Sequence, residues 1–599
     1  MTESVELLSQ DVKPKTSPNT KFSCSKISIG YTKIPIIDLK HLEESSQSQP
    51  CIEDTENEYN PFSVKNIQQY QPLYSLFFDM TRNNYNSIQF NHQFQIKNMT
   101  TLIDTVTNSD VNKQVFIKYS PLYDPIKYMI GKYHEGHDGN ICIQLPNKFS
   151  DDIKHSVEVT DKLESIHNAS YVDGFFCFLS SKLLHTFGFK HAMDYYGSYL
   201  GIQEQFKMNI VDDYEYLISS TFFNNHLNKL FKTTNPDFIH SLLNVNSRAN
   251  RNKLEMSGEP DDLILDVQEL TVPDYTEEMV ETTSSELEDI YKHSKPDTGH
   301  ISDDSSDSDN NYSTDEENTQ SDLCLDSDGS ESCCSEEEDD ESVDSNEPEN
   351  IYAYIRDFPV QMICLEKCEG TLDELFESGK MDEKRSASAL FQIVMTLIAY
   401  QKVFSFTHND LHTNNIMYVN TVKEYLYYKY QNIKYKVPTY GKIFKIIDFG
   451  RSIYHFQGHR FCSDSFGPGG DAVTQYNTEP YFDEKKPRIE PNDSFDLCRL
   501  GTSIFDFVFD IDDPNHDKKM NPLQATILRW CSDDSGKNVL YKRNGEERYP
   551  SFKLYKMIAR NVHNHTPQSQ LDFPFFKQFR FMGKPLKQPK YIINIDLLY

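Results

Sequence analysis

The sequence contains no stretch that approaches about 18 uninterrupted apolar residues, the minimum for a membrane-spanning helix. Its first ten residues, MTESVELLSQ, lack the basic and apolar segments of a secretory signal. The 12 cysteines are widely spaced and none forms a CxxC pair, which indicates free thiols in a reducing compartment. We therefore expect a soluble intracellular protein with no membrane partner.

Basic residues are missing from one long segment. Residues 301–350 contain 20 Asp and Glu and no Lys or Arg, so this window carries −20 of the formal net charge of −33. With many serines and few large apolar side chains, it cannot bury enough surface to offset the entropy lost on ordering. We expect an acidic, disordered insertion from about 245 to 350. Nucleic acid is not an expected partner, because binding phosphates requires clustered Lys and Arg.

Hydrophobic patterning outside this segment predicts a mixture of strands and helices. Residues 1–95 are polar and weakly patterned, which indicates an irregular, partly disordered extension. The predicted elements are a strand in 113–122, a helix over 170–187, strand character in 191–202, a strand, link and helix start over 359–376, a buried helix over 388–404 and a β-rich region over 425–450. Thr371 and Glu374 have the spacing of a helix capping box.

Two carboxylates stand at the edges of apolar elements. Asp410 lies in FTHNDLHTNNIMY (406–418), which follows the buried helix, and Asp448 follows Ile446 and Ile447. Asn415 comes five residues after Asp410. Phosphoryl transfer requires a carboxylate near the attacking hydroxyl and oxygen ligands for Mg²⁺. These residues therefore suit phosphoryl transfer assisted by Mg²⁺.

The pattern H-x-D-L-x-x-x-N, formed here by His408, Asp410, Leu411 and Asn415, is followed by D-F-G beginning at Asp448. Together these motifs resemble the catalytic segments of the protein-kinase-like superfamily. The segments VFIKYSPLYDP, YVDGFFCFLSS, EKCEGTLDEL and SFDLCRLG further resemble divergent serine/threonine kinase-like proteins of giant DNA viruses of the mimivirus type. The likeness covers about 100–210 and 355–560. If the chain is viral, it implies a location in the host cytoplasm or virion.

This resemblance implies a two-lobed α+β fold, with a small β-rich N-lobe containing one main helix and a larger, mostly helical C-lobe. The acidic insertion would interrupt the N-lobe between neighbouring strands. The implied divisions are an extension (1–95), the first part of the N-lobe (96–213), the insertion (214–350), the end of the N-lobe and hinge (351–368) and the C-lobe (369–599).

The resemblance also implies a role for individual residues. Asp410 would be the catalytic base with His412 aiding the γ-phosphate; Asn415 and Asp448 would hold Mg²⁺; Lys118, paired with Asp173, would contact the ATP phosphates; Glu366, Lys367 and Cys368 would face adenine; and His408, Gly450 and Asp496 would be structural, Asp496 bracing the catalytic loop. Four alternatives stay open: a solvated strand lysine at Lys118, Glu164 in place of Asp173, a core histidine at His412 and a helix N-cap at Asp496.

The chain departs from the superfamily pattern in several places. Residues 102–118 contain no glycine, so the phosphates would lack the close backbone cover that a glycine-rich loop provides. Asn409 replaces the arginine of H-R-D, no A-P-E is present, and the long stretch from Asn415 to Asp448 predicts an extended β-hairpin. The expected function is a serine/threonine protein kinase with protein substrates. A catalytically weak scaffold and a small-molecule kinase of the aminoglycoside or choline type are the alternatives.

Overall fold

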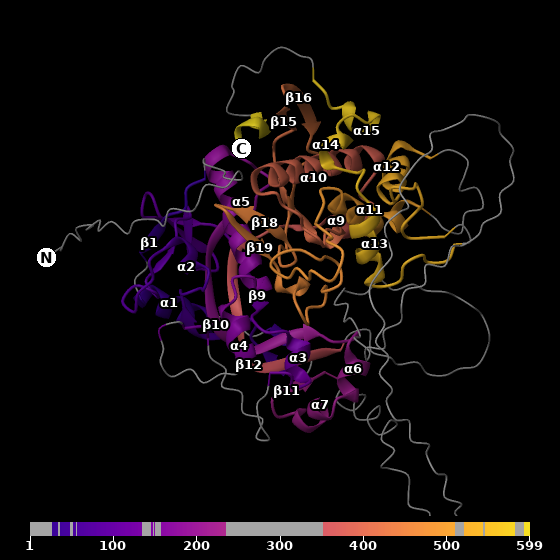
Figure 1. The fold of residues 1–599 in the computed structure, drawn as a ribbon. Coiled ribbons are helices and arrows are strands. Elements are labelled where there is room, and N and C mark those ends of the chain that lie inside the picture. The colour runs from indigo at the N-terminus through magenta and orange to yellow at the C-terminus, as the bar shows by residue number, and fades with distance from the viewer. Residues whose placement is uncertain are drawn as a thin grey trace, which may run out of the picture. The chain divides into compact units, whose positions relative to one another are not determined.

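The computed structural model describes residues 27–33, 36–47, 52–54, 57–133, 145–147, 149, 157–234, 351–509, 520–542, 545–581 and 592–599. The disorder predicted for 245–350 falls outside these residues. Within them the protein is a mixed α+β structure with several small sheets (Figure 1).

The largest sheet has five strands built around β12 (Tyr352–Glu366). The strand order is β11 (Phe231–Thr233), β12, β10 (Tyr195–Asn209) and β4 (Val64–Gln68), and β9 (Val115–Pro121) also pairs with β12. β10 and β12 run antiparallel along their whole length, from Tyr195 opposite Leu365 to Asn209 opposite Tyr352. The strands predicted on either side of the insertion therefore pair with each other, but the insertion begins later than the predicted residue 214, because β11 belongs to the same sheet and pairs with β12.

The insertion leaves and re-enters the sheet at adjoining positions. Thr234 ends the described segment before it, and its N–H donates to the carbonyl oxygen of Tyr352 at 2.9 Å. Such a junction tolerates a long connection, because the entropy of loop closure grows only logarithmically with loop length.

The two faces of the sheet contribute to separate cores. Ile363 and Leu365 of β12 belong to the larger core, which also contains the buried residues of helix α5 (Ala169–Phe187). Met362 and Cys364 alternate with them and belong to a smaller core on the opposite face. This alternation follows from the two-residue period of side chains along a strand. The predicted helix over 170–187 is thus confirmed within one residue.

The irregular extension predicted over residues 1–95 is wrong for much of the described part. That part contains β1 (Tyr31–Lys33), α1 (Ile36–Gln47), β2 (Ile52–Asp54), β3 (Asn57–Tyr59), β4, α2 (Tyr74–Phe77), β5 (Ile88–Phe90) and the start of β6 (Phe94–Asn98). Its strands are short, and some pair with segments distant in sequence: β4 pairs with β10, and β1 pairs with β5. Three to five residues are too few to show a clear period, so local patterning missed them.

The C-terminal half is organised around one buried helix. Helix α10 (Glu383–Phe404) begins five residues before the predicted start, with the Asp382 side chain as its N-cap. Its most apolar window is long enough to cross a membrane by length and composition, but 94% of that window is buried inside the protein, as in a core helix. The other α-helices described in this half are α9 (Leu372–Glu377), α11 (Phe495–Val508), α12 (Pro522–Trp530), α13 (Lys553–Asn561), α14 (Pro567–Gln570) and α15 (Pro574–Lys577). The predicted capping box at the start of α9 is confirmed.

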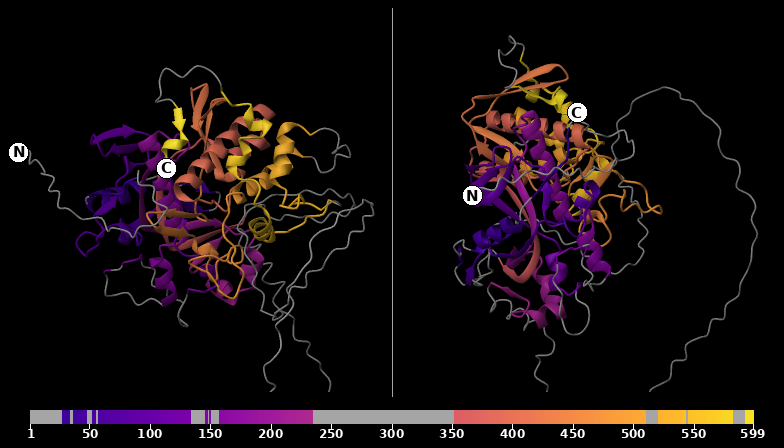
Figure 2. Two further views of the ribbon diagram at one scale, coloured as in Figure 1. Left: turned by 45° about the horizontal axis from the view of Figure 1, so that its top comes forward. Right: turned by 90° about the vertical axis from the view of Figure 1, so that its left-hand side faces the viewer.

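The β-rich region predicted over 425–450 is also confirmed. Strands β15 (Tyr425–Tyr430) and β16 (Ile433–Pro438) form the expected hairpin, and β20 (Ile592–Asn594) pairs with β15 (Figure 2). Strands β13 (Gly370–Thr371), β14 (Ile416–Asn420) and β17 (Lys442–Ile446) form a second small sheet. The remaining elements include β7 (Thr101–Asp104), β8 (Ser109–Asn112), α3 (Pro125–Met129), α4 (Val157–Glu164), α6 (Tyr214–Ser219), α7 (Thr221–His226), β18 (Ile453–Phe456) and β19 (His459–Cys462).

Candidate functional site

A lysine on the large sheet connects three distant segments. The amine of Lys118, on β9, lies 2.7 Å from Asp173 Oδ2 on α5 and 2.8 Å from Asp448 Oδ1, just after β17. Burial alone would lower the pKa of Lys118, but the two carboxylates raise it above its ordinary value. The lysine is therefore a fixed cation and not a solvated strand residue.

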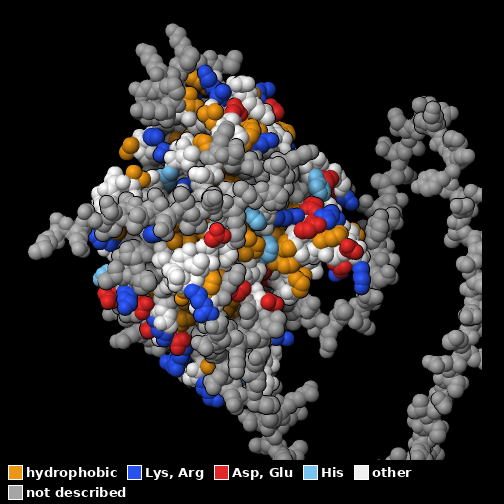
Figure 3. Space-filling model, turned by 60° about the vertical axis from the view of Figure 1, so that its left-hand side comes forward, with side chains coloured by type: hydrophobic (Ala, Val, Ile, Leu, Met, Phe, Trp, Pro, Cys, Tyr) orange, Lys and Arg blue, Asp and Glu red, His pale blue; other side chains and the backbone are white. Residues whose placement is uncertain are grey.

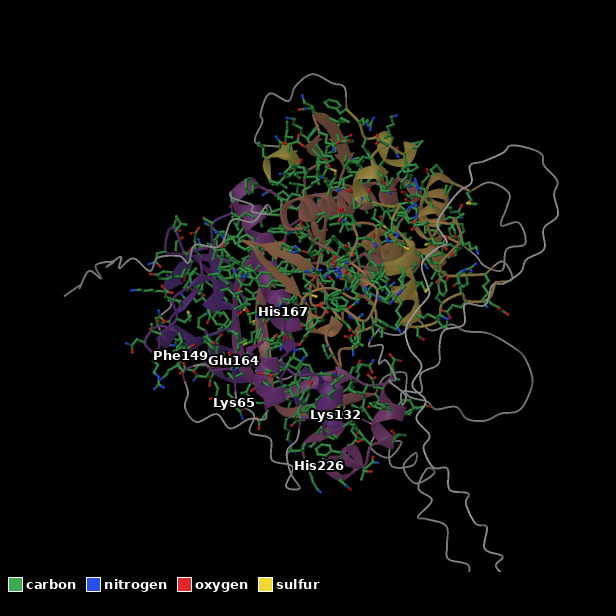
Figure 4. The ribbon with its side chains drawn as sticks, in the orientation of Figure 1. Lys65, Lys132, Phe149, Glu164, His167 and His226 are labelled. Atoms are coloured by element: carbon green, nitrogen blue, oxygen red, sulfur yellow. The ribbon has the colours of Figure 1, made fainter. Side chains whose placement is uncertain are left out.

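Asp173, and not Glu164, is the carboxylate that pairs with Lys118. Asp173 is 1% exposed, and its second oxygen accepts the backbone N–H of Phe449 at 3.0 Å. Glu164, labelled in Figure 4, stands at the end of α4. Its carboxylate instead accepts a hydrogen bond from the hydroxyl of Tyr70 at 3.3 Å. One acid thus binds both the lysine and the backbone next to Asp448.

Asp448 is the exposed member of this group. Its side chain is 46% exposed, and its backbone has a φ of 62°, a left-handed conformation that Asp tolerates better than most residues. Partial loss of solvent around the carboxyl would raise its pKa, but the charge of Lys118 and its hydrogen bond lower it to about 2. Asp448 is therefore ionised at neutral pH. Gly450 follows in the same turn, and its N–H lies 3.5 Å from Asp448 Oδ1.

Backbone hydrogen bonds join the loop of Asp410 to the segment before Asp448. Strands β14 and β17 pair from Ile416 opposite Ile446, and the Ile447 N–H donates to the Asn415 carbonyl at 3.0 Å. His408 donates through Nε2 to the Ile447 carbonyl at 2.9 Å. The fold thus brings the loop that holds Asp410 and Asn415 beside the turn that holds Asp448.

Asp410 is surrounded by donors that the sequence did not single out. The Tyr555 hydroxyl, on α13, donates to Asp410 Oδ1 at 2.8 Å, and the guanidinium groups of Arg451 and Arg499 lie 3.5 and 4.0 Å from the carboxylate. Burial would raise the pKa of Asp410, but the charges of Arg451 and Arg499 lower it. Arg451 directly follows the D-F-G motif and could have been found from that position, whereas no local signal marks Tyr555.

The side chain of Asn415 has a defined orientation. Its Nδ2 donates to the Asp410 carbonyl at 2.9 Å and to His412 Nε2 at 3.0 Å. Because both bonds use the amide nitrogen, the other end of the side chain is an oxygen able to bind a cation. His412 therefore positions Asn415, a contact that neither of the two predicted roles of this histidine included.

Asp496 braces the backbone of the loop in the predicted way. From α11, its two carboxylate oxygens accept the N–H groups of His408 and Asn409, each at 2.9 Å. Burial raises the pKa of Asp496. The Asn409 side chain donates to the Arg451 carbonyl at 2.8 Å and accepts from the Tyr476 hydroxyl at 2.9 Å. Asn409 thus makes neutral hydrogen bonds where kinases of the resembled superfamily carry a cationic arginine.

Of the three residues predicted to face adenine, Glu366 is already bonded to other parts of the protein. The Glu366 N–H donates to the Asp194 carbonyl at 3.0 Å, and its carboxylate forms an ion pair with Lys445 and accepts the Asp194 N–H. Among the described residues, the N–H groups of Lys367 and Cys368 donate no hydrogen bond. In the described part of the chain these two N–H groups therefore stay free, whereas the N–H and the carboxylate of Glu366 are already bonded.

The hairpin formed by β7 and β8 precedes Lys118 in the chain, where a glycine-rich loop would stand. At its tip the Asp104 carboxylate accepts the N–H groups of Val106 and Thr107, at 2.8 and 3.1 Å. The backbone donors of the tip are therefore already bonded, and they are bonded to an anion. This tip cannot receive phosphate in the way that a glycine-rich loop does.

The oxygen donors fit a magnesium ion better than a transition metal. In the described part of the chain, no group of three or more His, Cys, Asp or Glu is placed to hold a metal ion. Mg²⁺ does not need such a group, because it retains waters and is held by one or two protein oxygens together with phosphate oxygens. Asp448 and the Asn415 amide oxygen provide this kind of donor set.

Comparisons with known proteins give no independent assignment: no protein-family model and no curated protein matches the chain.

Proposed function

We propose that the chain is a two-lobed, kinase-like phosphotransferase that moves the γ-phosphoryl group of ATP to a serine or threonine hydroxyl of a protein. The observation that carries this proposal is the position of Lys118 between Asp173 and Asp448. A lysine held by one buried acid and one exposed acid is well suited to the phosphates of a nucleotide, with the exposed acid left to face a metal ion.

Each group of the site has a distinct task in this reaction. Mg²⁺, held by Asp448 and Asn415, would neutralise charge on the phosphates. Lys118 would bind the phosphates, and the N–H groups of Lys367 and Cys368 would bind the base. Asp410 would orient the substrate hydroxyl and accept its proton. Because neighbouring arginines lower the pKa of Asp410, its main contribution is orientation, with proton transfer occurring late in the step.

Nucleotide binding tests the proposal directly. The unfolding temperature is measured with ATP alone, Mg²⁺ alone and both together. ATP with Mg²⁺ at 100 times the Kd stabilises a binding protein by about 2.7 kcal/mol. We expect this shift in the wild type and its loss in Asp448→Asn. The matched control Asp572→Asn changes an exposed aspartate outside the site and should keep the full shift. No shift in the wild type would overturn the proposal.

A binding scaffold without catalysis is the second candidate, and the bonded tip of the β7–β8 hairpin favours it. Transfer of radiolabel from γ-labelled ATP to a mixture of protein substrates separates the two, with analysis of the labelled amino acids. Labelled serine or threonine that disappears in Asp410→Asn supports the kinase. A Mg²⁺-dependent thermal shift without any transfer supports the scaffold.

A further inference from the structure

A pocket of about 320 Å³ lies outside the candidate site. It is formed by the end of α9, the link to α10, the first turn of α10 and the turn between β16 and β17. None of its lining residues is among those that hold Lys118, Asp410 or Asp448. The phosphotransferase proposal therefore assigns it no task.

The floor of the pocket is apolar. Leu375 and Phe444 are buried in the larger core, and Met381 packs against it while half-buried. Tyr440 stands at the rim with 46% of its surface exposed, and its backbone has a φ of 47°. An apolar centre beside an exposed tyrosine is typical of surfaces that bind other proteins.

Three cations, Lys380, Arg385 and Lys442, surround this floor. Within the described residues the Lys380 side chain makes no ion pair and no hydrogen bond. Lys442 lies over the ring of Tyr418 at 3.9 Å, and Arg385 pairs with Asp382 on its own helix turn. Burial lowers the pKa of Lys442, and the nearby charge of Lys380 lowers it further. The charge of Glu369 acts in the opposite direction.

This gathering of positive charge stands out in a chain of net charge −33. On the face drawn in Figure 3, acidic and basic side chains are interspersed. An acidic partner is repelled by the protein as a whole and attracted where lysines and arginine collect without an equal number of acids. Charge complementarity therefore selects an acidic ligand, and the apolar floor requires that the ligand also carry an apolar group.

We propose that this pocket docks an acidic segment of a partner protein. One large apolar side chain of the segment would rest on Leu375, Met381 and Phe444, and its flanking carboxylates would face Lys380, Arg385 and Lys442. This docking is independent of nucleotide binding, so its test does not depend on the proposed catalytic function.

The probe is a fluorescent nine-residue peptide of glutamates with one central phenylalanine, and its binding to the full chain is followed by fluorescence anisotropy. We expect a Kd in the micromolar range. The double charge reversal Lys380→Glu with Lys442→Glu should weaken binding about tenfold or more, and binding to the wild type should weaken as salt is added. Met381→Ser should also weaken it, by removing part of the floor while leaving the charges in place.

Two controls make the result specific. Lys402→Glu with Lys577→Glu changes the net charge by the same amount at exposed positions outside the pocket and should leave the Kd unchanged within about twofold. A peptide with alanine in place of phenylalanine should bind at least about tenfold more weakly. The proposal is overturned if the control pair weakens binding as much as the pocket pair does. It is also overturned if the alanine peptide or a single-stranded oligonucleotide of equal charge binds as well as the phenylalanine peptide.

Discussion

Asp410 and Asp448 are the same residue type at the ends of neighbouring elements, yet their surroundings differ. Asp448 is 46% exposed and has one lysine as its ionic partner. Asp410 is only 16% exposed and is held by a tyrosine hydroxyl between two arginines. Both carboxyls have lowered pKa values, so charge alone does not distinguish them.

The difference in exposure and in partners is what separates their proposed tasks. An exposed carboxylate with a single partner retains lone pairs for a cation that arrives with a nucleotide. A carboxylate that accepts a tyrosine hydrogen bond and lies beside two arginines is held in one orientation, which suits the alignment of a substrate hydroxyl. The comparison teaches that the partners, and not the residue type or the ionisation state, define each role.

The largest expected effect comes from Asp410→Asn. Removing the carboxylate removes the group that orients the hydroxyl and accepts its proton, so we expect turnover to fall about 10²- to 10⁴-fold. The Mg²⁺-dependent thermal shift with ATP should remain, in contrast to Asp448→Asn. Steady-state transfer rates and thermal shifts are measured on both variants. If Asp410→Asn also loses the nucleotide shift, the two aspartates do not have separate tasks.

A third aspartate extends the comparison to stability. Asp496→Ala leaves the buried N–H groups of His408 and Asn409 without their acceptor, and we expect the free energy of unfolding to fall by about 3 kcal/mol. Urea unfolding measures the loss. Asp493→Ala, three residues earlier and exposed, is the matched control and should change stability by less than about 0.5 kcal/mol. Equal losses in the two variants would contradict the bracing role.

Tyr555→Phe sharpens the account of Asp410. The variant removes the hydroxyl that donates to Asp410 while keeping the ring, so we expect turnover to fall up to about tenfold. Loss of this donor should also move the acidic limb of the pH–rate profile to higher pH, because the hydrogen bond favours the ionised carboxylate. Tyr541→Phe removes a comparable bond from tyrosine to Asp506 and should leave the profile in place. An unshifted limb in Tyr555→Phe would show that the hydroxyl has no influence on Asp410.

The smallest expected effect concerns the free energy of unfolding at acid pH, where the contributions of Asp448 and Asp496 should change in opposite directions. The folded pKa of Asp448 is lowered to about 2, so its stabilising contribution is present above the ordinary value of 3.8 and is lost as pH falls from there through 2. The pKa of Asp496 is raised, so ionisation destabilises the folded protein and stability from this group decreases as pH rises above 3.8.

The measurement is the urea midpoint of the wild type, Asp448→Asn and Asp496→Asn between pH 5 and pH 2. The difference between wild type and Asp448→Asn should shrink toward acid pH. The urea midpoint of the wild type minus that of Asp496→Asn should increase as pH falls over the same range. Two differences that change with the same sign would refute the assigned pKa directions.

Much of this architecture could be predicted from local sequence. The apolar run of α10, the Thr371 and Glu374 capping box and the β15–β16 hairpin each depend on residues close together in the chain, and each was found. The strands before residue 95 were missed, because they are too short to show a clear period and some, such as β4 with its partner β10, are defined by segments distant in sequence. Local sequence also could not show that Glu366 is already bonded: its N–H donates to Asp194 and its carboxylate pairs with Lys445.

The sequence by itself determined which chemical groups are available: a carboxylate and an amide five residues apart, a second carboxylate before glycine, and a lysine on a strand. Only the tertiary structure decided how they are partnered. It paired Lys118 with Asp173 in place of Glu164, and it brought Tyr555 to Asp410 from 145 residues further along the chain. The physical reason is that local periodicity records which side of an element is buried, whereas the partners of a buried charge are set by packing between elements that are distant in sequence.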